Sequence, residues 1–146
     1  MDGEVEGPHR LLNPEALSSP VGFTHAVVAA PGRTVYLGGQ TAHDADDRLQ
    51  GVTTAEQFEA AAANVVTALD AAGARPDHLV SVQIYVTDVA QYRSSLDAIG
   101  GAWHRHFGRH YPAVALFGVP RLFDADAKVE LVCIAVIPDL SGRGHQ

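Results

Sequence analysis

The last apolar segment of the chain, residues 128–137 with the sequence KVELVCIAVI, constrains the fold most strongly. When it is read with the two-residue period of a strand, both faces are apolar, which is typical of a strand covered on both sides. Glu130 is the exception. Because an unpaired charge is costly to bury, this carboxylate lies at a wetted strand end, is paired or neutral, or takes part in function. The segment alone leaves these alternatives open.

Apolar residues with a period of two also predict several other strands. With the last segment, the predicted strands are residues 24–30, 34–41, 79–87, 113–119 and 128–137. The first two are separated only by Pro31-Gly32-Arg33, which predicts a β-hairpin.

Two helices are predicted between the strands. The first begins at Thr53, which has a capping-box spacing to Glu56, and ends near Gly73. The second follows Asp88, which can cap it. A Gly-Gly pair at residues 100 and 101 weakens the second helix and could kink it.

The predicted order is β-β-α-β-α-β-β, an α+β fold in which two helices pack on one face of a mixed sheet. We assign this domain to residues 15–138, with a loose N-terminal arm at residues 1–14 and a loose C-terminal tail at residues 139–146. Since the strands are apolar on both faces, the face without helices is expected to pack against another copy of the chain. The sequence therefore predicts a homo-oligomer.

Charge and cysteine content exclude several classes of protein. A net charge of −7 with a single lysine disfavours nucleic-acid binding. No apolar segment approaches the length of a membrane-spanning helix, and the acidic start MDGEVEGPHR does not resemble a signal peptide. Cys133 is the only cysteine and lies in an apolar strand, which indicates a buried, inert thiol and a reducing compartment. We expect a cytoplasmic protein without nucleic-acid or membrane partners.

Short polar motifs give no clear metal or cofactor site. His106 and His110 are one helical turn apart, but no acidic or cysteine ligand is in register, so two surface histidines are the preferred interpretation. The acidic loop at residues 44–47 lacks the glycine and glutamate of a calcium loop. The LGGQ stretch lacks the spacing of a phosphate loop, and its glycines favour a bulge or a close backbone approach.

Four longer segments carry a resemblance to a known family. In chain order they are NPEALSSPVGFTHAVVAAPGRTVYLGGQTAHDADDRLQG, AAANVVTALDAAGA, LVSVQIYVTDVAQY and YPAVALFGVPRLFDADAKVELVCIAV, within about residues 13–138. A Gly-Gln strand end, a Tyr-Pro-Ala step, an Arg-Leu pair and a final Val-Glu-Leu strand follow one another. This order resembles the RidA/YjgF family, which also has the name L-PSP endoribonuclease family.

The resemblance implies a chorismate-mutase-like α+β fold and a homotrimer, whose sheets form an inner barrel and whose three clefts lie between subunits. Family members typically hydrolyse reactive enamines and imines to a carbonyl compound and ammonia, without a cofactor. Glu130 falls on the family's glutamate, which holds the attacking water, so the resemblance implies that it is catalytic. Gly39 and Gln40 fall on the Gly-Gln pair that lines the cleft.

The chain departs from the family pattern around the substrate. Val114 stands where the family has the arginine that binds the substrate carboxylate, and Arg121, seven residues further on, does not replace it. Leu116 stands for a common cysteine, Phe23 for a common tyrosine and Gly38 for a serine. Since a guanidinium forks two hydrogen bonds onto a carboxylate and a valine offers none, weak binding of imines derived from amino acids is expected.

The implied cleft is therefore apolar, with Phe117 beside Phe23, Val114 and Leu116. His25 is expected near its mouth, where an imidazole could act as acid or base. Two functions stay open: a deaminase for an imine or enamine without the usual α-carboxylate, and a non-catalytic trimer that binds apolar small molecules. Ribonuclease activity, suggested by the second family name, is disfavoured by the acidic charge.

Overall fold

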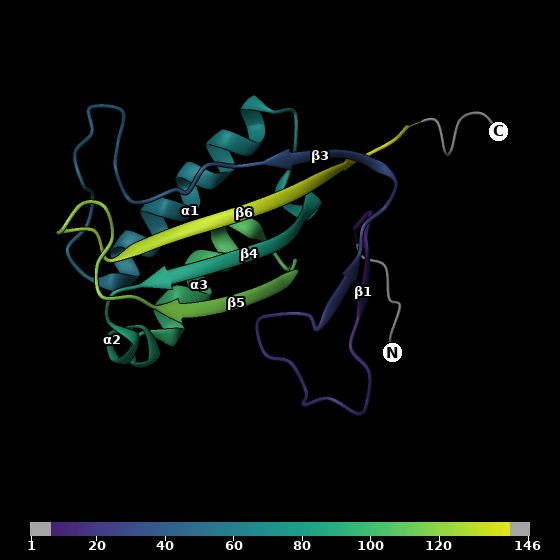
Figure 1. Ribbon diagram of the computed structural model, residues 1–146, viewed down its shortest axis with the longest axis horizontal. Coiled ribbons are helices and arrows are strands. Elements are labelled where there is room, and N and C mark those ends of the chain that lie inside the picture. The colour runs from purple at the N-terminus through teal and green to yellow at the C-terminus, as the bar shows by residue number, and fades with distance from the viewer. Residues whose placement is uncertain (1–6, 141–146) are drawn as a thin grey trace.

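The computed structural model describes residues 7–140 and has one mixed sheet as its centre (Figure 1). Its strands are β3 (Gly32–Tyr36), β4 (Leu79–Val86), β5 (Ala113–Gly118) and β6 (Val129–Pro138). The strand order is β3-β6-β4-β5, so β3 and β5 form the two edges. β6 is antiparallel to both of its neighbours, whereas β4 and β5 are parallel. The mixed α+β fold expected from the sequence is confirmed.

The helices lie together on one side of this sheet (Figure 1). They are α1 (Thr54–Ala71), α2 (Val89–Ser94) and α3 (Leu96–Phe107), with a short 3₁₀ helix, η1 (Pro76–His78), before β4. The capping box at the start of α1 is confirmed, because the Thr53 hydroxyl accepts from the Glu56 N–H and the Glu56 carboxylate accepts from the Thr53 N–H. The second predicted helix is divided at Ser95, not kinked at its glycine pair.

Burial alternates along β6. Val129, Leu131 and Cys133 face the helices and are at most 1% exposed. Glu130 and Ile134 are partly exposed on the opposite face, which the helices leave open in the single chain (Figure 1). The helix layer therefore explains the apolar residues on one face of β6. The helices do not cover the apolar residues on its other face.

The predicted hairpin is wrong. β2 (Ala26–Val28) pairs with β1 (Arg10–Leu12), whereas β3 pairs with β6. The Pro-Gly turn signal has a different cause: a Cβ at Gly32 would fall 2.0 Å from the Ile137 carbonyl oxygen, so glycine is needed where β3 closely approaches β6.

The arm predicted for residues 1–14 is partly ordered. Residues 10–12 form β1, and the neighbouring His9 is 1% exposed. The Ala30 N–H donates to His9 Nδ1, and His9 Nε2 lies 3.1 Å from the His78 carbonyl oxygen, so this segment is anchored to η1. Residues 1–6 of the arm and 141–146 of the tail lie outside the described residues, and the domain boundaries stay a prediction.

The single cysteine is buried, as expected. Cys133 is 1% exposed, and burial raises the pKa of its thiol to about 12. A thiol that stays protonated is a poor nucleophile, which fits a packing role. Within residues 7–140, no helix is long and apolar enough to cross a membrane.

Candidate functional site

The Gly-Gln strand end forms a bulge against β6. The Leu37 N–H donates to the Cys133 carbonyl at 3.1 Å, and Gln40 exchanges two backbone hydrogen bonds of 2.8 Å with Leu131. Between these pairs, Gly38 and Gly39 lie opposite a single residue of β6. Two residues against one define a β-bulge, a feature that often re-aims side chains next to functional sites.

The bulge brings backbone directly against Glu130. A Cβ built on Gly39 would fall 1.9 Å from Glu130 Oε2, so only glycine leaves room for this carboxylate. Within the described part of the chain, Glu130 forms no ion pair. Of the alternatives that the sequence left open for Glu130, a salt bridge is therefore excluded among residues 7–140. Its carboxylate faces a cavity instead.

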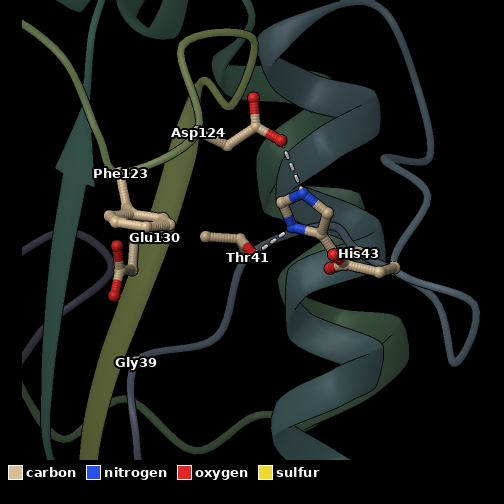
Figure 2. Close-up of a pocket in the computed structure, with 7 residues that line it drawn as sticks. Gly39, Thr41, His43, Phe123, Asp124 and Glu130 are labelled. Carbon is tan, nitrogen blue, oxygen red and sulfur yellow. Dashed lines mark hydrogen bonds and ion pairs between the residues drawn. The ribbon is translucent and has the colours of Figure 1, made fainter.

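This cavity has a volume of about 410 Å³ and lies between the bulge and the loop before β6 (Figure 2). We call it the Glu130 cavity. It is lined by Gly39, Thr41, His43, Asp47, Phe123, Asp124 and Glu130. None of these residues is a lysine or arginine, so the cavity combines three carboxylates with one imidazole and one hydroxyl.

Three of the lining side chains form a hydrogen-bonded chain. Thr41 Oγ1 lies 2.6 Å from His43 Nδ1, and His43 Nε2 lies 2.9 Å from Asp124 Oδ2 (Figure 2). Asp124 Oδ1 accepts from the Asp126 N–H. The Asp126 N–H and the His43 ring lower the pKa of Asp124, so this carboxyl is ionised near neutral pH. An ionised carboxylate can only accept, so it takes the Nε2–H of His43.

Backbone contacts fix the positions of Thr41 and His43. The Asn64 amide on α1 donates to the carbonyls of both residues at 2.8 Å.

The acidic loop that follows is held by Asp44, whose side chain accepts from the N–H groups of Asp46 and Arg48. This loop is thus closed by its own hydrogen bonds.

A second cavity lies at the other edge of the sheet. It has a volume of about 650 Å³ and is mostly apolar. We call it the apolar cavity. It lies between the edge strand β5, helices α2 and α3, and the loop at residues 21–23. Its lining residues are Val21, Gly22, Phe23, Ile84, Tyr92, Leu96, Ile99, Gly100, Trp103, Tyr111, Val114 and Leu116.

The structure divides the predicted cleft residues between these places. Phe23, Val114 and Leu116 line the apolar cavity, whereas Glu130 and Gly39 line the Glu130 cavity. The two cavities share no residue. The single chain therefore does not bring the predicted catalytic carboxylate and the predicted substrate pocket together.

Four predicted residues, Gly38, Gln40, Phe117 and His25, line neither cavity. Gln40 donates through its side chain to the Gly38 carbonyl across the bulge at 3.2 Å. Phe117 stacks on Tyr85 on the open face of the sheet, with ring centroids 5.1 Å apart. His25 Nε2 lies 2.7 Å from the Ser18 carbonyl oxygen, so this imidazole stabilises the loop between residues 18 and 25.

The histidines considered for a metal site have structural contacts instead. His106 Nε2 lies 3.2 Å from Glu59, which also forms a two-pronged pair with Arg105 at 2.7 and 2.9 Å. The Arg105 guanidinium lowers the pKa of Glu59 to about 2. His110 is 8% exposed, with Nε2 2.7 Å from the Leu79 carbonyl oxygen, so the prediction of a surface histidine is wrong there. Among residues 7–140, no three histidine, cysteine, aspartate or glutamate residues are arranged so that they could hold a metal ion.

Comparison with known proteins identifies the family. The family model described as Endoribonuclease L-PSP matches residues 14–137. The chain belongs to this family. The Endoribonuclease L-PSP family is also known as the Rid or YjgF family, as the names of similar solved structures show. No curated protein sequence matches the chain significantly.

Solved structures of the Rid family have the same fold. A Rid-family protein of unknown function from Yersinia pestis, YyfB, is 30% identical, with a TM-score of 0.81 over 90% of this chain and 100% of that one. A member of the YjgF/YER057c/UK114 family from Mycobacterium tuberculosis is 28% identical, with a TM-score of 0.59 over 80% and 88%. RidA from an Antarctic Psychrobacter, at 23% identity and a TM-score of 0.63 over 87% and 98%, is similar in fold alone.

Sequence reasoning missed Thr41, His43 and Asp124. His43 and Asp124 are 81 positions apart in the chain, and each lies in a polar loop without periodicity. The available signal was the position of Thr41 directly after the Gly-Gln pair and of Asp124 shortly before Glu130. Because β3 and β6 are antiparallel, the loop after β3 and the loop before β6 meet at the same end of this strand pair.

Proposed function

We propose that this protein hydrolyses an imine or enamine to a carbonyl compound and ammonia, in clefts between the subunits of a homotrimer. Family membership supports this reaction class. The observation that carries the proposal is the Glu130 carboxylate, which lies at a cavity and against a residue that must be glycine, with no ion pair to any of residues 7–140.

Glu130 has the chemistry to bind and orient water. A carboxylate accepts hydrogen bonds, so it can hold a water by one O–H while the oxygen lone pair points at an imine carbon. Glycine at position 39 keeps side-chain atoms away from this carboxylate, which leaves space for the water and the reacting carbon.

The division of the predicted cleft supports assembly. The Glu130 cavity lies beside the β3 edge of the sheet, and the apolar cavity lies beside the β5 edge. Two halves at opposite edges of one sheet can meet only across a contact between different copies. A contact between two different surfaces closes into a ring when the rotation permits it, and three copies would give three complete clefts.

The apolar cavity favours a substrate without a carboxylate. Val114 lines this cavity with Phe23 and Leu116, and no lysine or arginine is among its lining residues. A carboxylate placed here would lose its water without gaining a positively charged partner, which costs on the order of 2–5 kcal/mol relative to a paired one. We therefore propose an aromatic or aliphatic imine as the substrate class.

The substrate class is tested by two probes. Diphenylmethanimine carries no carboxylate and can be added directly, whereas 2-iminopropanoate is generated from alanine by an amino-acid oxidase and trapped with semicarbazide. We expect the wild type to have the higher kcat/KM for diphenylmethanimine. Val114→Arg should raise kcat/KM for 2-iminopropanoate by about 30-fold, which corresponds to about 2 kcal/mol of new charged hydrogen bonding.

Val114→Met is the matched control, because it adds length without charge and should not favour 2-iminopropanoate. A wild type that prefers 2-iminopropanoate, or a Val114→Arg variant with unchanged preference, would contradict this substrate class.

A second function, binding of apolar molecules without turnover, is favoured by the apolar cavity itself. Trp103 lines this cavity and is the only tryptophan, so its fluorescence reports on ligands there. Saturable quenching by diphenylmethane together with no turnover of either imine would favour this alternative. Ribonuclease activity is not proposed, since three carboxylates around the Glu130 cavity would repel phosphates.

A further inference from the structure

The Glu130 cavity contains a second set of polar groups that the proposed role of Glu130 does not use. Asp124, His43 and Thr41 form a carboxylate–imidazole–hydroxyl chain with distances of 2.9 and 2.6 Å. The His43 side chain is 19% exposed, and all three residues line the cavity. The hydrogen-bonded chain therefore ends at Thr41, which lines the same cavity as Glu130.

The protonation pattern of this chain follows from its partners. Because the ionised Asp124 can only accept, the neutral form of His43 carries its proton on Nε2 and presents a lone pair at Nδ1. The Thr41 hydroxyl then donates its proton to Nδ1. A hydroxyl that donates in this way still has oxygen lone pairs, which can accept a proton from a water. In this arrangement, His43 is a base that activates the Thr41 hydroxyl beside it.

Thr41 and Glu130 are neighbours across the bulge. The bridge between Gln40 and Leu131 is antiparallel, so the residues on either side, Thr41 and Glu130, lie opposite one another. Side chains of such opposed residues project from the same face, with Cβ atoms about 5 Å apart. Figure 2 shows Thr41 between Glu130 and the His43 ring.

We call Thr41, His43 and Asp124 the relay. Contacts within the protein fix the positions of these three residues without any substrate. Asn64 holds the Thr41 and His43 carbonyls, and the Asp126 N–H holds the second oxygen of Asp124. Side chains that are already oriented do not have to reorganise during a reaction. Such groups therefore contribute most to stabilising the transition state.

We propose that Thr41 and His43 form the second proton-transfer path of this site, with Thr41 taking the proton of the attacking water and His43 receiving the proton of Thr41. This inference rests on the proposed imine hydrolysis and assigns residues to a step that Glu130 alone does not complete. Thr41 touches the reacting water, whereas His43 and Asp124 act through it.

The proposed steps balance. Water adds to the carbon of a protonated imine, the C–O bond forms, and the electron pair of the C=N bond moves to nitrogen. The water proton passes to Thr41 while the Thr41 proton passes to His43, whose positive charge Asp124 stabilises. The same path then returns that proton to the amine nitrogen of the adduct. When the C–N bond breaks with its electron pair on nitrogen, the hydroxyl proton of the adduct passes to Glu130, and the released ammonia takes it up as ammonium.

The charge of the cavity favours this role over an attack by Thr41 on an ester. Attack on an ester produces an oxyanion, which the nearby Glu130 carboxylate would destabilise. Addition of water to a cationic imine neutralises a positive charge, which three carboxylates tolerate. The same arrangement of groups therefore suits a cationic substrate.

The test uses three variants and diphenylmethanimine as the probe. Thr41→Val removes the hydroxyl with little change in shape, Thr41→Ser keeps it, and Asp124→Asn reverses the tautomer of His43 because an amide N–H then donates to Nε2. We expect kcat to fall roughly 100-fold in Thr41→Val and Asp124→Asn, within the usual range for a general base, with KM changed by less than about threefold. Thr41→Ser should keep kcat within about threefold of the wild type.

The outcomes separate this inference from the proposed function. Loss of activity in Glu130→Gln together with an unchanged kcat in Thr41→Val and Asp124→Asn would overturn the relay alone. Equal losses in Thr41→Val and Thr41→Ser would also overturn it, because a hydroxyl would then not be the group that matters. A wild type that turns over no imine would overturn the relay and the proposed function together.

Discussion

Replacing Gly39 with alanine should lower imine turnover by roughly 100-fold and leave the fold intact. The new Cβ would fall 1.9 Å from Glu130 Oε2, so the carboxylate must move away from the position where it faces the cavity. Because the atom in conflict is the end of a flexible side chain, the clash is relieved by rotation and costs little stability. The measurement is kcat for diphenylmethanimine beside a thermal unfolding curve.

Gly38→Ala is the matched control at the neighbouring position. A Cβ at Gly38 meets no atom within 4 Å, so this variant should keep wild-type turnover in the single-chain geometry. If Gly39→Ala kept wild-type turnover, the position of the Glu130 carboxylate would not matter for the reaction. If both variants lost activity equally, the bulge as a whole would be the important feature.

Replacing Ile134 with glutamate should dissociate the proposed homotrimer and abolish turnover. Ile134 pairs with Tyr36 on the open face of the sheet, and Tyr36 is 77% exposed in the single chain. If this face packs against other copies, three unpaired carboxylates would be buried on assembly. Each would cost on the order of 3 kcal/mol or more, enough to weaken the assembly by more than about 100-fold. Native mass measurement and the imine assay give the two readouts.

Thr67→Glu is the control for Ile134→Glu, since it adds the same charge at an exposed position of α1 on the helix layer. It should leave both mass and turnover unchanged. A wild type with the mass of a monomer would contradict the proposed assembly directly. An Ile134→Glu variant that stays trimeric would show that the open face is not where the copies meet.

The fold was largely predictable because most of its signals are local. The alternation along β6, the capping box at Thr53 and the end of α1 near Gly73 each depend on residues within a few positions of one another. The helix layer on one face followed from the ratio of helices to strands. These features need no knowledge of distant contacts.

The errors lie where a local signal has a distant cause. The Pro-Gly step before β3 resembles a hairpin turn, but Gly32 is required by the Ile137 carbonyl of β6. The glycine pair in α3 resembles a kink, whereas the helix is divided at Ser95, which has φ −117° and ψ 22°. The polar neighbours of His110 favour a surface position, but this residue is buried beside β4.

The site could be predicted only in part for the same reason. Glu130 is notable because it interrupts an apolar strand, and the glycines next to Gln40 indicate a bulge or a close approach, which the structure confirms. His43 and Asp124 are brought together by the pairing of strand ends, so nothing in their own neighbourhoods indicates a contact. Likewise, the sequence could not show that Val114 and Glu130 line two different cavities.

The most direct test of the central claim is turnover of diphenylmethanimine by the wild type and by Glu130→Gln. The amide has almost the same size as the carboxylate but cannot act as a base. If Glu130 holds the attacking water and accepts a proton during the reaction, release of benzophenone and ammonia should be clearly faster with the wild type than in buffer. The kcat should then fall by roughly 100-fold or more in Glu130→Gln at unchanged stability. Equal turnover by the two proteins, or none by the wild type, would contradict the claim that imine hydrolysis depends on this carboxylate.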